Sequence, residues 1–248
     1  WGYSKPQGAV VVPDSVPFLG TNHAVTKVGN NAFRRCDSVT AITLPASVAT
    51  LDRNCFRQCF RLASINIPQG VTSIGYSAFS DCIGLTSVTI PSSVTAIDEW
   101  AFCRCYSLTS VNIPEGVTEI PSYCFYYDSL LTVVNLPSSL TTIGKRSFNR
   151  CTSLQSINLP NGLTIIDDNA FDYCSSLHSI TLPGGGEGLK FYLAPNIENV
   201  KQVGWFNLIV GAMNQAFFTL SSGIASMEVF ESYMSDENSI LGEAVKIC

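Results

Sequence analysis

The sequence predicts a repeat solenoid built around a parallel β-sheet, because one pattern of fixed length recurs from Phe33 to Pro183. Proline returns at a constant interval, at Pro45, Pro68, Pro91, Pro114, Pro137, Pro160 and Pro183. Phenylalanine keeps the same interval, at Phe33, Phe56, Phe79, Phe102, Phe125, Phe148 and Phe171. A fixed period of about this length is typical of solenoids, in which each unit covers its apolar face by stacking on its neighbours.

Each unit follows the pattern L-x-x-[VI]-x-[LI]-P-x-x-[VL]-x-x-[LI]-x-x-x-[small]-F-x-x-C. In one copy the alternation of Val111 and Ile113 predicts a strand. Pro114 ends that strand, because proline cannot donate a ladder hydrogen bond. Val117 and Ile120 then turn inward on a second short segment. The phenylalanine fills the convex half of the core, and the small residue before it lets neighbouring coils approach closely.

The pattern resembles the BspA-like leucine-rich repeats, which occur on bacterial surfaces, and the resemblance covers about residues 16–183. It implies a leucine-rich-repeat arc with a parallel sheet on the concave side and short strand, 3-10 or helical turns on the convex side. The resemblance also implies a non-catalytic module that binds host or matrix proteins. The copy around Asp128 departs from the pattern, since the other copies have Cys at that position.

Four regions follow from these signals. Residues 1–24 are predicted to form a degenerate first coil that caps the core, because Val16 and Leu19 fall in phase with the strand positions. Residues 25–183 form the solenoid, and the glycine-rich run 184–188 is a linker. Residues 189–248 share no repeat signal and are predicted to be a C-terminal helical segment.

Seven strands are predicted on the concave side, starting near Val39, Leu62, Leu85, Leu108, Leu131, Leu154 and Leu177. Two columns of residues point outward from them and contain no charge. The first is the predicted partner-binding surface: Thr43, Asn66, Thr89, Asn112, Asn135, Asn158 and Thr181. The second is Ala41, Ser64, Ser87, Ser110, Val133, Ser156 and Ser179. The alternative interpretation is that these residues only supply β-propensity and solubility.

The basic residues cluster elsewhere, around the phenylalanine positions: Arg34, Arg35, Arg57, Arg61, Arg104, Lys145, Arg146 and Arg150. Such a cluster can contact an anionic lipid or protein. The alternative is a solvated surface of mixed charge, because four aspartates interleave with the cations: Asp37, Asp81, Asp128 and Asp172.

Six of the ten cysteines occupy one repeat position: Cys36, Cys59, Cys82, Cys105, Cys151 and Cys174. The position points inward, where free Cys packs as a small hydrophobe, so the sequence favours a ladder of buried thiols. Disulfides between neighbouring coils stay open as an alternative, because adjacent coils lie near the permitted Cα separation.

The segment 203–227 carries no charged side chain from end to end, and it is long enough for a membrane span. The central amides of Asn214 and Gln215 favour instead a helix that caps the last coil. The residues predicted to anchor the segment in either case are Phe206, Val210, Met213, Phe217 and Leu220.

The sequence indicates no enzyme, and we expect no catalytic residues, no cofactor and no metal. His23 and His178 lie at opposite ends of the repeats, so no Ser/His/Asp or Cys/His set can be assembled. The net charge of −5 argues against a nucleic-acid partner.

Two functions stay open. One is a recognition module for a protein partner at a cell surface or membrane. The other is a structural accessory subunit of a larger complex, for which a membrane complex of an alga or protist is one candidate, anchored by residues 189–248. The chain starts at Trp1 without a signal-peptide pattern, and we interpret it as a processed or truncated form.

Overall fold

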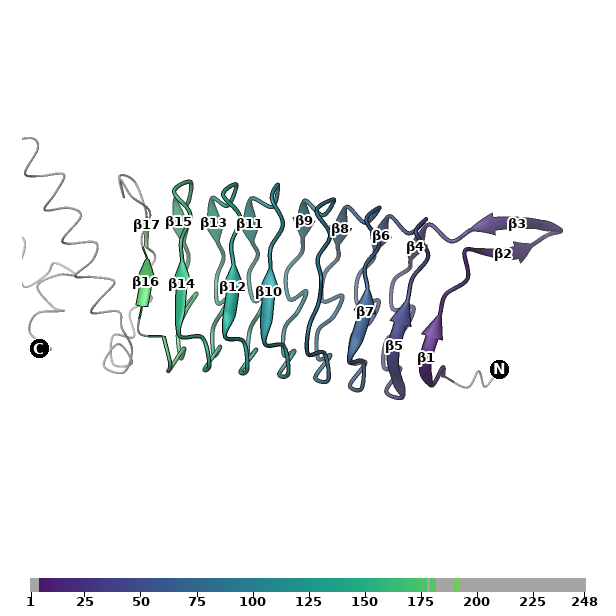
Figure 1. The fold of residues 1–248 in the computed structure, drawn as a ribbon, viewed down its shortest axis with the longest axis horizontal. Helices are drawn as coiled ribbons and strands as arrows, with labels where there is room; N and C mark the ends of the chain where they lie inside the picture. The colour runs from purple at the N-terminus through teal and green to yellow at the C-terminus, as the bar shows by residue number, and fades with distance from the viewer. Residues whose placement is uncertain (1–4, 178, 182–189, 192–248) are drawn as a thin grey trace, which may run out of the picture. The chain divides into compact units, whose positions relative to one another are not determined.

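The computed structural model describes residues 5–177, 179–181 and 190–191, and within these residues every regular element is a β-strand. Successive coils stack side by side, and their strands lie in two rows (Figure 1). This confirms the predicted parallel solenoid. The predicted C-terminal helical segment, 189–248, lies outside the described residues except for Lys190–Phe191.

The first row contains the strands that end before the repeat proline: β5 (Val39–Thr43), β7 (Ser64–Asn66), β10 (Ser110–Asn112), β12 (Val133–Asn135), β14 (Ser156–Asn158) and β16 (Ser179–Thr181). They pair in parallel in twos, β5 with β7, β10 with β12 and β14 with β16. The strand predicted near Leu85 is not regular. Only an isolated bridge joins Ser87 to Ser110 there. Its copy keeps the inward apolar residues, so side-chain packing is retained while the backbone ladder is interrupted.

The second row confirms the second inward segment of the repeat: β4 (Lys27–Val28), β6 (Thr50–Leu51), β8 (Ser73–Ile74), β9 (Ala96–Ile97), β11 (Glu119–Ile120), β13 (Thr142–Ile143), β15 (Ile165–Ile166) and β17 (Lys190–Phe191). They form two parallel sheets, in the orders β4-β6-β8-β9 and β11-β13-β15-β17. The pairing of β17 with β15 extends this row beyond the last sequence repeat.

The third side of each coil carries the phenylalanine and consists of hydrogen-bonded turns without helix in the described residues. Backbone bonds join these turns from coil to coil. Phe79 N–H donates to the carbonyl of Ala101 at 2.8 Å, and Phe102 N–H donates to that of Cys124 at 3.0 Å. A large residue before the phenylalanine would separate the coils, which explains the small residue of the pattern.

The phenylalanines form a continuous stack through the core, with ring centroids 5.2 to 5.5 Å apart from Phe33 to Phe171. From Phe56 onward these rings are fully buried. Phe102, for example, is stacked between Phe79 at 5.2 Å and Phe125 at 5.5 Å. Each ring therefore completes its contacts only when both neighbouring coils are in place.

The N-terminal cap differs from the prediction. The strand that pairs with the first repeat is β1 (Gly8–Val11), in which Val10 lies opposite Ile42. Val16 and Leu19 were predicted to occupy strand positions of that coil, but they are 44% and 87% exposed.

Both residues belong instead to an antiparallel hairpin of β2 (Ser15–Phe18) and β3 (Thr21–Ala24). Leu19 and Gly20 connect the strands with φ of 51° and 81°. Two consecutive residues with positive φ are typical of the type I′ turn, which closes the tightest hairpins. The local turn geometry therefore overrides the repeat phase.

We expect Phe102→Ala to lower the free energy of unfolding by about 3–5 kcal/mol, because the substitution opens a cavity that the flanking rings cannot close. Urea unfolding followed by circular dichroism measures the change. Tyr173→Ala removes an aromatic ring that is 42% exposed and serves as the control. A loss below about 1 kcal/mol for Phe102→Ala would contradict the stacked core.

Candidate functional site

The exposed side of the first row, called the strand face below, is the column Thr43, Asn66, Thr89, Asn112, Asn135, Asn158 and Thr181. The structure places three pairs of these predicted residues in register, the first being Thr43 and Asn66 between β5 and β7. Asn112 lies opposite Asn135 between β10 and β12, and Asn158 lies opposite Thr181 between β14 and β16. Every member from Thr43 to Asn158 is exposed.

The amides of the strand face differ in what they bind. Asn66 Oδ1 accepts a hydrogen bond from Leu44 N–H at 2.8 Å, and Asn66 Nδ2 donates to Leu44 O at 3.2 Å, so this amide closes the end of β5. Within the described part of the chain, the side chains of Asn112, Asn135 and Asn158 make no hydrogen bond. These three amides therefore present both a donor and an acceptor to solvent.

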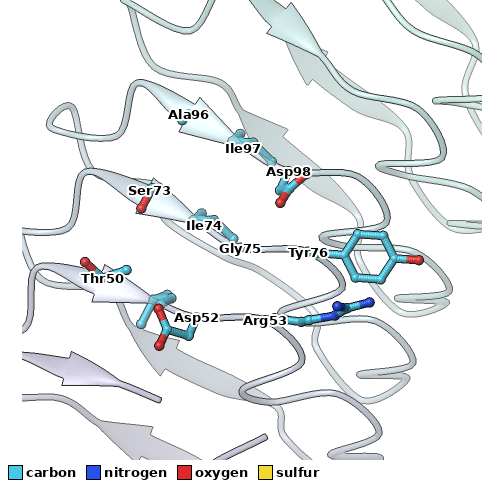
Figure 2. Close-up of a pocket in the computed structure, with 11 residues that line it drawn as sticks. Thr50, Asp52, Arg53, Ser73, Ile74, Gly75, Tyr76, Ala96, Ile97 and Asp98 are labelled. Atoms are coloured by element: carbon cyan, nitrogen blue, oxygen red, sulfur yellow. The ribbon is translucent and has the colours of Figure 1, made fainter. Parts of the chain in front are cut away.

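A shallow depression of about 630 Å³ lies over β6, β8 and β9 (Figure 2). Gly75 is one of the residues that line it, and a side chain at this position would place its Cβ 2.9 Å from the backbone of Asp52. Asp52 pairs with Lys27 at 3.4 Å, and Asp98 Oδ1 accepts the Glu99 N–H at 2.8 Å. Among the described residues that line it there is no His or Cys.

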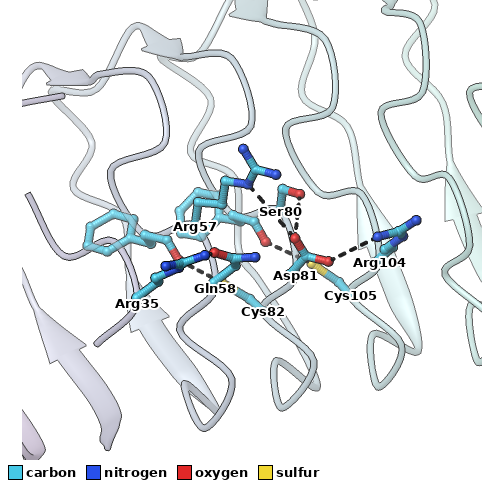
Figure 3. A network of polar contacts seen from close by, with 10 residues as sticks. Arg35, Arg57, Gln58, Ser80, Asp81, Cys82, Arg104 and Cys105 are labelled. Carbon is cyan, nitrogen blue, oxygen red and sulfur yellow. Dashed lines mark hydrogen bonds and ion pairs between the residues drawn. The ribbon is translucent and has the colours of Figure 1, made fainter. Parts of the chain in front are cut away.

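The turns of the first coils carry a polar network (Figure 3). Asp81 lies between two cations, with Oδ2 3.9 Å from Arg57 Nε and Oδ1 3.7 Å from Arg104 Nη1. Arg35 Nε donates to Gln58 Oε1 of the next coil at 2.9 Å. This part of the predicted basic cluster is therefore a surface of mixed charge.

Aromatic side chains that the sequence analysis did not single out gather on the turns of the later coils. Trp100 and Tyr123 stack with ring centroids 4.1 Å apart, and Tyr126 packs edge-on against both. The available sequence signal was the segment Tyr-Cys-Phe-Tyr-Tyr at 123–127, in which aromatic residues replace the polar residues of earlier copies.

Other predicted sites are placed as follows. His23 lies on β3, where its Nε2 is 2.8 Å from Thr21 Oγ1. Among the described residues no group of three His, Cys, Asp or Glu side chains could hold a metal ion. No helix in the same part of the chain is long and apolar enough to cross a membrane. The segment 203–227, with its predicted anchor residues, lies outside the described residues, as does His178.

The repeat pattern and the two-row coil agree with a known family. The model of the BspA-type leucine-rich repeat region matches six copies, over residues 26–134 and 118–234. The chain belongs to the BspA-type leucine-rich repeat family. A comparison with curated protein sequences finds no match.

Solved structures of leucine-rich repeat proteins share this fold. A leucine-rich repeat protein of Bacteroides ovatus is 32% identical with a TM-score of 0.73, and the match covers 79% of this chain and 50% of that one. A leucine-rich cell surface protein of Faecalibacterium prausnitzii is 34% identical with a TM-score of 0.65, over 71% and 48%. A leucine-rich repeat protein of T. pallidum is 30% identical with a TM-score of 0.51, over 71% and 70%. The chain spans about half the length of the first two.

The cysteine position of the BspA-type repeat forms the predicted ladder of free thiols, since all nine cysteines of the described residues are unpaired and buried. Five thiols of the ladder, those of Cys59, Cys82, Cys105, Cys151 and Cys174, donate to the phenylalanine carbonyl of the preceding coil. Cys59 Sγ lies 3.0 Å from Phe33 O, and Cys105 Sγ lies 3.3 Å from Phe79 O. The ladder therefore links coils through hydrogen bonds instead of disulfides.

Asp128 replaces one thiol of the ladder, and the prediction that it belongs to the mixed-charge surface is wrong because it is fully buried. Its Oδ1 accepts a hydrogen bond from Cys105 N–H at 2.8 Å, while Oδ2 has no partner. Burial raises the pKa of this carboxyl well above its usual value, and the Cys105 bond opposes the shift only in part. The thiols of Cys124 and Cys151 lie in the same interior and supply no positive charge.

We expect Cys82, Cys105 and Cys151 to resist alkylation in the native protein. Full burial raises the pKa of each thiol well above its usual value and also blocks access of the reagent. Mass spectrometry after iodoacetamide treatment identifies the modified positions, and the same treatment in urea should label all three. Rapid native labelling at these positions would contradict the buried ladder.

We expect Asp128→Cys to raise the free energy of unfolding at neutral pH by about 1–3 kcal/mol, because it removes a buried carboxyl oxygen that has no partner. The pH dependence has a definite sign. The folded state holds the proton above the unfolded pKa of about 3.9, so stability is greatest below that pH and falls as pH rises toward the folded pKa.

Urea unfolding between about pH 4.5 and 7 tests this effect, because unfolded thiols do not yet ionise in that range. Asp128→Asn is the matched control, since it keeps the shape but cannot ionise. The stability of the natural chain should fall with pH relative to both variants. A relative rise would mean that Asp128 is ionised in the folded protein.

Proposed function

We propose that this chain is a non-catalytic recognition module that binds a protein partner through the strand face. The observation that carries the proposal is the set of exposed amides at Asn112, Asn135 and Asn158, which hold the same position in consecutive coils and whose hydrogen-bonding groups are unoccupied within the described residues. An amide offers two donors and an acceptor, and three of them in line fit the backbone groups of an extended segment or loop.

The strand face has no charged residue, and this determines how binding responds to salt. The column and its neighbour from Ala41 to Ser179 contain no ionisable residue, and Val133 in the neighbouring column is 48% exposed. Salt screens interactions between exposed charges and leaves hydrogen bonds and apolar contacts largely intact. Binding through this face is therefore expected to depend weakly on ionic strength.

A cell-surface setting is part of the proposal. One of the similar solved proteins is a leucine-rich cell surface protein of Faecalibacterium prausnitzii. The repeat itself supports recognition more than catalysis, because solenoids offer long regular surfaces on which several coils contact one partner.

Binding of the full chain to a panel of purified extracellular-matrix proteins tests the proposal. The double variant Asn112→Arg, Asn135→Arg places two large charges on the strand face and should weaken binding to a captured member at least tenfold, about 1.4 kcal/mol. The control Thr95→Arg, Thr118→Arg places the same charges one repeat apart at exposed positions before the second row.

The control variant should bind like the natural chain, and raising the salt concentration should change both affinities little. Equal losses in the two double variants, or no loss in the first, would contradict recognition through the strand face. Unfolding midpoints of all three proteins establish that the substitutions leave the solenoid intact.

A further inference from the structure

The turns beside the phenylalanine stack hold two residues per coil in the left-handed region, with φ between 52° and 68°. They lie two positions before and two positions after each phenylalanine. The first column is Asn31, Asn54, Ser77, Trp100, Tyr123, Arg146 and Asn169. The second column is Arg35, Gln58, Asp81, Arg104, Tyr127, Arg150 and Tyr173. Because every coil repeats it, the fold imposes this conformation, and only the choice of residue varies.

The residue types in these columns change along the solenoid. The early coils mostly use Asn, Ser, Gln and Asp, and Asn and Asp tolerate positive φ better than other side chains. From the fourth coil onward the positions hold Trp, Tyr and Arg, with Asn169 as the exception. Bulky residues raise the free energy of a left-handed backbone, so local stability does not explain their presence.

Most of these bulky residues join the neighbouring rings of Tyr106 and Tyr126 in one continuous surface, called the aromatic patch below: Trp100, Tyr106, Tyr123, Tyr126, Tyr127, Arg146, Arg150 and Tyr173. Its centre is the stack of Trp100 on Tyr123, and Tyr126 connects that stack to Tyr127 at 4.8 Å. The rings are partly exposed, and Tyr106 and Tyr173 reach 38% and 42%. The patch therefore presents aromatic edges and faces to solvent.

The patch also carries cations that lack carboxylate partners. Arg150 lies over Tyr127 at 4.9 Å and over Tyr173 at 4.2 Å, and Arg146 lies 6.0 Å from the ring of Tyr123. Neither guanidinium forms an ion pair within the described residues, and Arg146 Nε is buried without a hydrogen-bond acceptor. Arg57 and Arg104, outside the patch, differ because they share the carboxylate of Asp81 (Figure 3).

We propose that the aromatic patch is a docking surface for an acidic segment of a protein partner. Carboxylates of the segment pair with Arg146 and Arg150, whose planar forks suit bidentate contacts, and its apolar atoms lie on the exposed rings. Trp, Tyr and Arg are the residues that dominate binding energy in protein interfaces. This surface and its charge are separate from the strand face, so the inference does not depend on the function proposed for that face.

The probe for the test is a soluble random copolymer of glutamate and tyrosine, with a lysine–tyrosine copolymer as the charge control. Biolayer interferometry on the full chain measures affinity at low and high salt. We expect binding of the glutamate copolymer alone, weakened at least tenfold by high salt, since the contact depends on exposed charges. Absence of binding at low salt, or equal binding of the lysine copolymer, would overturn the proposal.

The variant Trp100→Asn, Tyr123→Asn separates binding from stability, because Asn31, Asn54 and Asn169 occupy the same column in other coils. It should lose binding at least tenfold while its urea midpoint stays equal or rises. A lowered midpoint with unchanged binding would assign the rings to coil packing and refute docking.

The variant Arg146→Gln, Arg150→Gln should lose binding at least tenfold and reduce the salt dependence. Its matched control is Arg34→Gln, Arg61→Gln, which removes two exposed arginines outside the patch and should bind like the natural chain. Equal losses in the two pairs would indicate attraction by net charge alone and would overturn the proposal.

A further binding measurement uses alginate, a polysaccharide that carries carboxylates without peptide groups. Alginate binding as tight as that of the copolymer would overturn the assignment to a protein partner.

Discussion

The stacking of one coil on the next, with residues one repeat apart lying opposite each other wherever the strands pair, is the constraint on which the rest of this structure depends. A single coil cannot cover its own apolar face, so the phenylalanine rings, the thiols and the strand residues complete their contacts only across coil boundaries. The backbone bonds between Phe79 and Ala101 show how close the approach is. Because the register is fixed, each outward position becomes a column with a spacing of about 4.8 Å between parallel strands. The surface chemistry of the molecule is therefore decided column by column.

The same constraint separates two surfaces of different chemistry. The strand face carries no charge and offers amides, whereas the aromatic patch combines rings with unpaired guanidinium groups. A residue other than Gly or Asn in the left-handed conformation destabilises the fold by about 1–2 kcal/mol. The turns contain two left-handed positions per coil. The buried phenylalanine stack and its coil-to-coil bonds must offset that cost. Residue choice at Trp100 or Tyr123 is consequently free to serve a contact with another molecule, because the core supplies the stability.

The repeat made most of the fold predictable from the sequence, and the failures have physical causes. Periodic apolar positions specify the two strand rows, the phenylalanine stack and the inward cysteines, because each depends on packing that recurs in every coil. The irregular backbone near Leu85 was not predictable, since its inward residues fit the pattern and only the hydrogen-bond ladder differs. The hairpin containing Leu19 follows a local turn preference that competes with the period. The aromatic patch was missed because contacts such as Arg150 with Tyr173 join residues of different coils.

The positions that depart from the repeat carry the information about function that the repeat itself lacks. Packing dictates the inward residues of every BspA-type coil, so those residues report the fold and are shared by proteins with different partners. Asp128 shows that a departure can also be internal, since its carboxyl is buried among thiols and affects stability with pH. Trp100 and Tyr123 depart on the outside, at positions where packing does not require a ring and the backbone disfavours one. Residues that differ from the repeat pattern, lower local stability and are exposed to solvent are therefore the best candidates for contacts with another molecule. By that criterion the later turns are a candidate for specificity beside the strand face, where Thr43 and Thr89 fit ordinary β-propensity and the asparagines do not.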